Sequence, residues 1–188
     1  MKNRHKLLLF FGLLLILGSL GLVLCKGIFD RIYQAETEYI TERLEAVMPQ
    51  RHAGVKDAFS VMDMPALSVE GEDFIGLVEI PNYGVKLPLC GDWQPTKLSM
   101  YPCCFCGTVY DGSLVIGGSD VQFGSLKTIG HGDVVMVTDM TGAVFSYRVE
   151  RITRSGSADA QTLQSNEFDL TLFIRDPYTL EYVLVRCN

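Results

Sequence analysis

The sequence predicts a mainly β domain, a sandwich or closed β-barrel of about eight strands, that follows an N-terminal transmembrane helix and a short amphipathic helix. Three observations lead to this prediction. Residues 7–25 form an apolar run without charge, and residues 28–48 place apolar side chains at helical spacing. From Phe74 onward, short runs rich in Val, Ile and Tyr alternate with Gly, Asp and Pro turns.

The apolar run, LLLFFGLLLILGSLGLVLC, predicts a membrane anchor, because a helix needs about twenty apolar residues to cross a bilayer. Lys2, Arg4 and Lys6 precede it, which favours a cytoplasmic position for residues 1–6 and an extracellular position for the C-terminal domain at the cell membrane. A cleaved signal peptide or a lipoprotein remains the alternative. The first usually has a shorter apolar core, and the second normally has a small residue where Leu24 precedes Cys25.

The charge of the exported part argues against nucleic acid as a partner. All 22 acidic residues follow the anchor together with 13 basic residues, which gives a net charge of −9. A protein that holds phosphates needs a basic patch, and no such patch is present in the sequence.

Residues 26–70 are interpreted as a helical stalk and linker. The apolar positions are mostly three or four residues apart, which is typical of an amphipathic helix that acts as a stalk or packs on the following domain. They are Ile28, Phe29, Ile32, Tyr33, Ile40, Leu44, Val47 and Met48. Pro49 ends this helix, and residues 50–70 show no clean period.

Residues 71–188 form the predicted β domain. Its strands are expected at Phe74–Ile80, Val85–Leu89, Leu114–Gly117, Asp133–Thr138, Val144–Thr153, Leu170–Ile174 and Tyr182–Arg186. The segment from Leu98 to Gly107 is expected to be helix or loop.

Four segments of this domain carry a family resemblance. They read FIGLVEIPNYGVKLP from Phe74, LVIGGSDVQFGSLKTIGHGD from Leu114, VFSYRV from Val144 and LTLFIRDPY from Leu170. In this unbroken order they resemble the sortases, the membrane-anchored cysteine transpeptidases of Gram-positive surfaces, and are more similar to the pilin-type and housekeeping classes (C, D and A) than to the haem-associated class. The resemblance implies a sortase-like closed barrel.

The resemblance also indicates a degenerate catalytic triad. Sortases use His, Cys and Arg, and the matching positions here are Ser119, Arg175 and Tyr182. Sortase chemistry needs a thiolate nucleophile, an acid for the leaving amine and a cation for the carbonyl oxygen. Ser119 does not titrate near neutral pH, and Arg175 stays charged and is never a nucleophile. We therefore expect a pseudoenzyme.

A rearranged active site is the first alternative. His5 precedes the anchor and His52 is in the linker, so the candidate pair is Cys187 with His131, which is in a Gly-rich turn. Such a pair would make the chain an active cysteine transpeptidase.

The groove implied by the family pattern contains Ser119, Asp120, Arg175, Asp176 and Tyr182. A buried guanidinium without a partner is costly, so Asp120 or Asp176 is expected to pair with Arg175, with Glu181 as a further candidate. The carboxylate of a ligand, or an exposed arginine at a strand end, are the alternatives.

The six cysteines suggest a second alternative, a thiol-redox or zinc-binding β domain. Cys103 and Cys106 have Cys-x-x-Cys spacing, with Cys104 between them. A structural zinc site usually needs four ligands, and no second pair follows, so no metal or cofactor is expected. Disulfides are allowed outside the cell, and with Cys25 at the membrane edge an odd number of cysteines remains.

These observations predict a membrane-anchored extracytoplasmic protein without catalytic activity. Its expected partner is a peptide sorting signal or a surface-assembly protein, such as a working sortase or a pilin subunit. The groove is inferred from analogy at the level of the fold.

Overall fold

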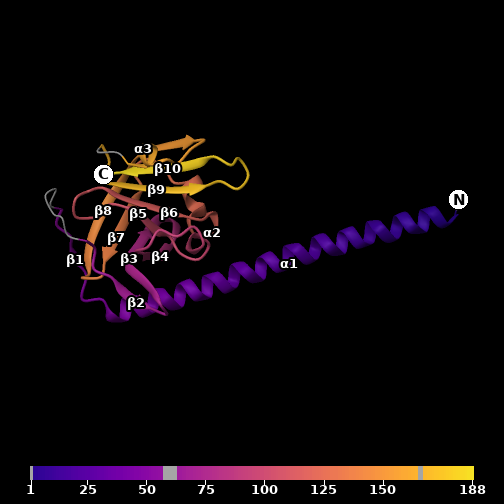
Figure 1. Cartoon of the computed structure of the whole chain (residues 1–188), viewed down its shortest axis with the longest axis horizontal. Helices are drawn as coiled ribbons and strands as arrows, with labels where there is room; N and C mark the ends of the chain where they lie inside the picture. The colour runs from indigo at the N-terminus through magenta and orange to yellow at the C-terminus, as the bar shows by residue number, and fades with distance from the viewer. Residues whose placement is uncertain (1, 57–62, 165–166) are drawn as a thin grey trace. The chain divides into compact units, whose positions relative to one another are not determined.

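The computed structural model describes residues 2–56, 63–164 and 167–188 (Figure 1). The chain divides into two compact units, one that ends at Glu36 and one that spans Thr37–Asn188. The first unit is helical, and the second is a β-barrel with the end of the same helix packed on it.

Helix α1 (Lys2–Val47) is continuous, where the sequence predicted two separate helices. The residues between the predicted helices are Lys26 and Gly27, and a single glycine costs about 1 kcal/mol in a helix, which is too little to end it. Within the described residues, no helix is both long enough and apolar enough to cross a membrane.

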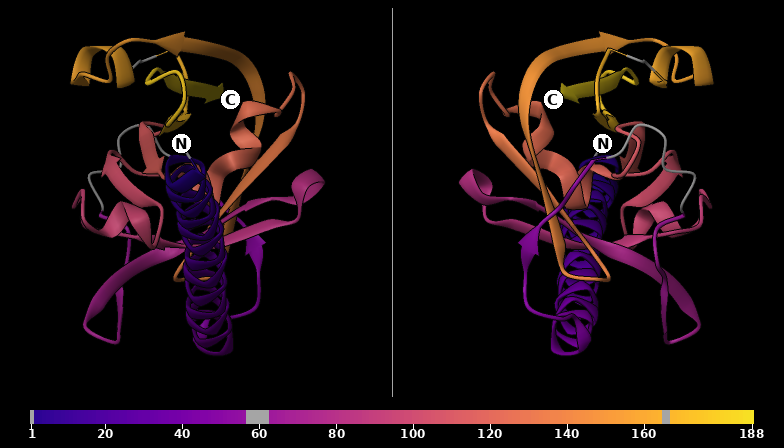
Figure 2. Two further views of the ribbon diagram at one scale, coloured as in Figure 1. Left: turned by 90° about the vertical axis from the view of Figure 1, so that its right-hand side faces the viewer. Right: turned by 90° about the vertical axis from the view of Figure 1, so that its left-hand side faces the viewer.

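Eight strands close a ring in the spatial order β8, β10, β9, β6, β5, β4, β3 and β7, which confirms the predicted barrel of about eight strands. Their bounds are β3 (Glu72–Ile80), β4 (Val85–Cys90), β5 (Cys103–Cys106), β6 (Leu114–Gly118), β7 (Val134–Asp139), β8 (Ala143–Ser155), β9 (Leu170–Arg175) and β10 (Tyr182–Cys187). Strand β8 pairs with β7 along its first half and with β10 along its second, and Figure 2 shows how strongly this ribbon bends.

Seven of the eight ring strands are those that the sequence predicted. Strand β5 is in the segment expected to be helix or loop. It is four residues long and carries a bulge between Cys104 and Cys106, so it has no alternating pattern to detect. The predicted linker contains two short strands, β1 (His52–Ala53) and β2 (Leu67–Val69). Strand β1 pairs with β8, and strand β2 pairs with β3.

The remaining regular elements are short. Helices α2 (Asp120–Phe123) and α3 (Ala160–Leu163) have one turn each. Three 3-10 helices span Pro81–Tyr83, Lys97–Ser99 and Gly124–Lys127.

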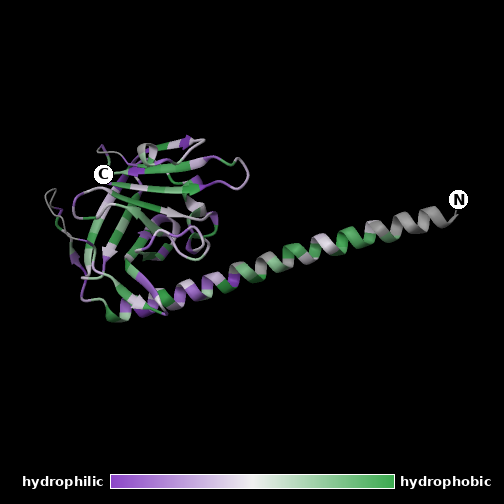
Figure 3. Cartoon of the chain, in the orientation of Figure 1, coloured by the Kyte–Doolittle hydropathy of each residue, from purple (hydrophilic) through white to green (hydrophobic). Residues whose placement is uncertain are grey.

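The barrel interior is filled by apolar side chains that alternate along each strand. Figure 3 shows that the barrel strands carry many hydrophobic residues, drawn in green. On β9, Leu172 and Ile174 are fully buried in this interior, whereas Phe173 belongs to a separate cluster on the outer face. The residue after Ile174 therefore points outward, and this residue is Arg175.

A second apolar cluster covers the outer face of β3, β4 and β5. Ile40 and Leu44 of α1 are 2% and 0% exposed there and pack with Phe74, Leu77 and Tyr101. Full burial of one such side chain contributes about 1.5–3 kcal/mol. The end of the predicted stalk is therefore part of the barrel unit.

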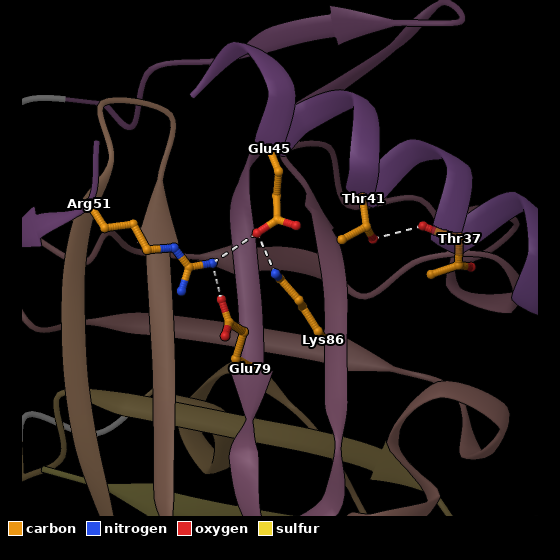
Figure 4. A network of polar contacts seen from close by, with 6 residues as sticks. All are labelled: Thr37, Thr41, Glu45, Arg51, Glu79 and Lys86. Atoms are coloured by element: carbon orange, nitrogen blue, oxygen red, sulfur yellow. Dashed lines mark hydrogen bonds and ion pairs between the residues drawn. The ribbon is translucent and has the colours of Figure 1, made fainter. Parts of the chain in front are cut away.

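A group of ion pairs lies at the end of α1 (Figure 4). Glu45 of α1 accepts hydrogen bonds from Lys86 of β4 and from Arg51, whose guanidinium also donates to Glu79 of β3 at 2.5 Å. Most of these side chains are over one third exposed, and such pairs are worth about 0–1 kcal/mol each. The apolar cluster therefore dominates the attachment.

Candidate functional site

The three positions singled out by the family pattern come together at one end of the barrel. Gly118 of β6 pairs with Ile174 of β9 in parallel register, so the following residues, Ser119 and Arg175, lie side by side. Tyr182 of β10 lies directly opposite Arg175. The three positions, which the family pattern assigned to one groove, therefore lie next to one another in the structure.

Arg175 and Tyr182 form a cation–aromatic pair on the outer face. The guanidinium carbon is 5.8 Å from the centroid of the tyrosine ring. The Nε–H of Arg175 donates to the carbonyl of Leu180 at 3.4 Å, and the arginine side chain is exposed. The guanidinium thus lies over the ring while the arginine side chain as a whole remains exposed.

Ser119 is the N-cap of α2 and is engaged by Gln122. The Gln122 side-chain oxygen accepts from the Ser119 backbone N–H at 3.1 Å and from the Ser119 hydroxyl. The Gln122 amide then donates to the carbonyl of Ser99 at 2.8 Å. The hydroxyl of Ser119 is committed to an amide oxygen, which is not a base that could activate it.

The acidic residues of the groove are bonded to other cations. Asp120 pairs with Lys127 at 2.5 Å. Asp176 is buried, 3.6 Å from Lys127 and 3.8 Å from Arg154. The backbone N–H of Tyr178, with smaller contributions from Thr179 and these two cations, holds the pKa of Asp176 below its usual range.

The predicted pairing of Arg175 with Asp120 or Asp176 is therefore wrong. Within the described part of the chain, Arg175 makes no ion pair, and Glu181 makes none either. Because Arg175 faces solvent on the outer side of β9, it does not need the partner that a buried guanidinium would require. The structure instead agrees with the alternative expectation, in which Arg175 is an exposed arginine at the end of a strand.

An aromatic cluster, hereafter the outer aromatic cluster (Trp93, Phe105, Phe173 and Tyr182), extends from this site across β9, β6 and β5. The Trp93 ring centroid is 4.9 Å from that of Phe105 and 5.7 Å from that of Phe173, which is 6.4 Å from that of Tyr182. Gly117 makes this packing possible, because a Cβ there would be 2.6 Å from both Trp93 and Phe173.

Sequence reasoning missed Trp93, Phe105 and Lys127 as parts of the site. Phe105 is on the unpredicted strand β5, and Trp93 reaches the site from the loop of residues 91–102. The one available signal was that Trp93 is the single tryptophan of the chain. Lys127 follows α2 and links Asp120 to Asp176, with its Nζ 5.4 Å from the Tyr178 ring centroid.

The alternative pair of Cys187 and His131 is not formed. Cys187 is fully buried in the barrel interior, where burial raises the pKa of its thiol to about 12. His131 is exposed in the turn before β7, and His52 is exposed on β1. Cys187 is therefore a neutral thiol at neutral pH, facing away from the outer face on which Arg175 and Tyr182 lie.

The Cys-x-x-Cys residues face different parts of the molecule. Cys103 belongs to the cluster under α1, Cys106 packs beside the outer aromatic cluster, and Cys104 between them packs against the barrel interior. Among the residues that the structure describes, no group of three or more His, Cys, Asp or Glu side chains could hold a metal ion. This arrangement does not favour the zinc-binding alternative.

The surface at this end of the barrel is formed by Arg175, Tyr182 and the outer aromatic cluster. It offers an exposed guanidinium, a tyrosine hydroxyl and apolar aromatic surface. In the described residues no thiol, imidazole and guanidinium are brought together, as a cysteine transpeptidase would need.

Solved structures of sortases share this fold. Sortase C1 from Streptococcus suis is 26% identical, with 61% of this chain and 72% of that chain covered and a TM-score of 0.53. Sortase C from Clostridium perfringens, solved with the C-terminal cell wall sorting motif, is 23% identical over 62% and 70%, with a TM-score of 0.53. A sortase D5 transpeptidase from Clostridium perfringens is 20% identical over 62% and 78%, with a TM-score of 0.54.

These likenesses confirm the sortase fold that the sequence predicted. No protein-family model matches the sequence, and no curated protein matches it either. What this chain does therefore has to be argued from its own site.

Proposed function

We propose that this chain is a membrane-anchored, extracytoplasmic protein of sortase fold that binds a peptide segment of a surface protein without cleaving it. The observation that carries the proposal is the side-by-side placement of Ser119, Arg175 and Tyr182 at one end of β6, β9 and β10. At the point where a sortase needs a nucleophile, this chain has a permanent cation.

The anchor rests on the sequence. Residues 7–25 carry no charge and are preceded by three basic residues, which is typical of a single-pass helix with a cytoplasmic N-terminus. Protease treatment of intact cells tests this. Loss of the C-terminal domain supports external exposure, and full protection would contradict it.

Arg175 is the residue that we expect to contact the ligand. Its own acidic neighbours, Asp120 and Asp176, are engaged by Lys127 and Arg154, so its guanidinium is left for a carboxylate or a peptide carbonyl. The outer aromatic cluster beside it supplies apolar surface for the side chains of an extended peptide. The sorting-motif complex of the related sortase C supports a peptide as the partner class.

One assay separates binding from catalysis. The purified full chain is incubated with a panel of labelled sorting-signal peptides and an amine nucleophile, and the products are followed by mass spectrometry. We expect binding by fluorescence anisotropy with no cleaved or ligated product. Product above the level of a Ser119→Ala/Arg175→Ala variant would instead support an active transpeptidase with a rearranged site.

A further inference from the structure

Two cysteines outside the site lie opposite each other on neighbouring strands. Cys90 is the last residue of β4, Cys103 is the first of β5, and the two are partners in parallel register. Neighbouring strands are about 4.8 Å apart, with partner side chains on the same face. This spacing is within the range of about 4.4–6.8 Å between Cα atoms that a disulfide needs.

Both cysteines are free and fully buried in the apolar cluster under α1. The Cys90 thiol donates to the carbonyl of Asp92 at 3.6 Å, and the Cys103 thiol donates to the carbonyl of Tyr101 at 3.5 Å. The neighbouring Cys103 thiol lowers the pKa of Cys90, with smaller contributions from the backbone of Asp92 and the charge of Lys97. The neighbouring Cys90 thiol, together with burial, raises the pKa of Cys103. Cys90 is therefore the sulfur that ionises first, and Cys103 is the thiol that remains to resolve an exchange.

The other cysteines of the barrel have no such partner among the described residues. Cys104 and Cys187 pack in the barrel interior, where burial raises the pKa of each thiol to about 12. Cys106 faces the outer side and accepts a hydrogen bond from the Gln164 amide at 3.2 Å. The geometry therefore selects one pair from the odd number of cysteines that follow the anchor.

We propose that Cys90 and Cys103 form a reversible disulfide that closes the loop of residues 91–102. The inference goes beyond peptide binding and does not depend on it. It assigns a covalent modification site to the pair of Cys90 and Cys103, whereas the Cys-x-x-Cys spacing pointed to Cys103 with Cys106.

The chemistry is thiol–disulfide exchange with an external disulfide, R–S–S–R. The Cys90 thiolate attacks one sulfur, which forms a mixed disulfide and releases one RS⁻ group. Cys103 then loses its proton and attacks the Cys90 sulfur, which forms the internal disulfide and releases the second RS⁻ group. Two protein thiols are oxidised, the external disulfide is reduced to two thiols, and the strand ends must open because both sulfurs are buried.

The loop that this bond would close reaches the candidate site. Trp93 packs on Phe173 in the outer aromatic cluster, and the carbonyl of Ser99 accepts the hydrogen bond from Gln122, which also holds Ser119. The disulfide would therefore hold Trp93 over Gly117. The redox state of Cys90 and Cys103 would then affect how the outer aromatic cluster is packed.

Cross-link mapping tests the proposal on the purified full chain. The protein is equilibrated in buffers of oxidised and reduced glutathione, quenched in acid, denatured, alkylated and digested. We expect the Cys90 and Cys103 peptides to be joined, with the same link in a Cys104→Ser control. Complete alkylation of both residues at every ratio, or a link from Cys103 to another cysteine, would overturn the proposal.

A second measurement tests whether the bond fastens the loop. Closing a loop of this size should raise the melting temperature of the oxidised wild type by roughly 6–12 °C over the reduced form. Acrylamide should quench the single tryptophan, Trp93, less in the oxidised form. The Cys90→Ser variant should show neither change, and a cross-linked wild type without a higher melting temperature would contradict the fastening role.

Discussion

Arg175 of β9 lies directly opposite Tyr182 of β10, with its guanidinium carbon 5.8 Å from the centroid of the tyrosine ring. The ring restricts where the guanidinium can go, and the carbonyl of Leu180 fixes its Nε–H. An arginine held in this way loses less conformational entropy when it binds a ligand than a free surface arginine does. The pair is therefore suited to recognition of a carboxylate or a peptide carbonyl.

Replacement of Arg175 by alanine should weaken binding of a carboxylate-bearing peptide about tenfold or more, because a hydrogen bond to a charged group is worth about 1.5–3 kcal/mol. Arg175→Lys should recover part of the loss, since lysine keeps the charge but lacks the planar fork. Fluorescence anisotropy measures both affinities. Arg148→Ala is the matched control, because Arg148 is an exposed arginine on β8. An equal loss of affinity in the control would mean that Arg175 contributes only through the overall positive charge of the protein.

The outward direction of residue 175 can be tested by cysteine labelling. An Arg175→Cys thiol should react with a maleimide at least about tenfold faster than an Ile174→Cys thiol, because Ile174 is fully buried in the barrel interior and reacts only after local opening. Mass spectrometry of the peptide that contains residues 174 and 175 gives both rates. Equal rates would mean that the register of β9 at its end is different from the one described.

The sequence was sufficient to predict the strands that form this site. In the structure, residues 170–174 alternate between the interior and the outer face. The position of Arg175 followed from the resemblance of the segment LTLFIRDPY to the family, with Pro177 and Tyr178 fixing the register. Ser119 and Tyr182 followed from the order of neighbouring segments in the family. The family resemblance and the order of its segments were therefore enough to predict that Ser119, Arg175 and Tyr182, which are distant in the sequence, lie close together.

The missed features depend on contacts between distant segments. Strand β5 is held by pairing with β4 and β6, and its short bulged sequence carries no period. Trp93 reaches the outer face from a loop, and the proximity of Cys90 to Cys103 comes from a single pair in register. Spacing along the chain does not encode contacts of this kind. The continuity of α1 was not predicted, because the change from an apolar to an amphipathic sequence resembled a boundary between two helices.

The carboxylate of Asp176 should make stability depend on acid pH. Its pKa is held below its usual range, mainly by the Tyr178 N–H, so the stabilisation is complete above the unfolded value of about 3.9 and is lost as the pH falls through the lower folded value. The melting temperature of the wild type should therefore fall more steeply below about pH 4 than that of Asp176→Asn. Thermal melts monitored by circular dichroism measure this difference.

The control for this prediction is Asp63→Asn, which removes an exposed carboxylate that makes no ion pair among the described residues. Its acid profile should follow that of the wild type. If the wild type and Asp176→Asn have parallel profiles, the hydrogen bonds to Asp176 do not stabilise the turn that connects β9 to β10.

The end of α1 should contribute to the stability of the barrel. Leu44 is 0% exposed and packs with Phe74 and Leu77, whereas Val47 of the same helix is 58% exposed. Leu44→Ala should lower the free energy of unfolding by about 2–5 kcal/mol, because it removes buried apolar surface and leaves a cavity. Val47→Ala should change it by no more than about 0.5 kcal/mol. Urea unfolding followed by Trp93 fluorescence measures both, and equal effects would mean that residues 37–47 do not pack on the barrel in solution.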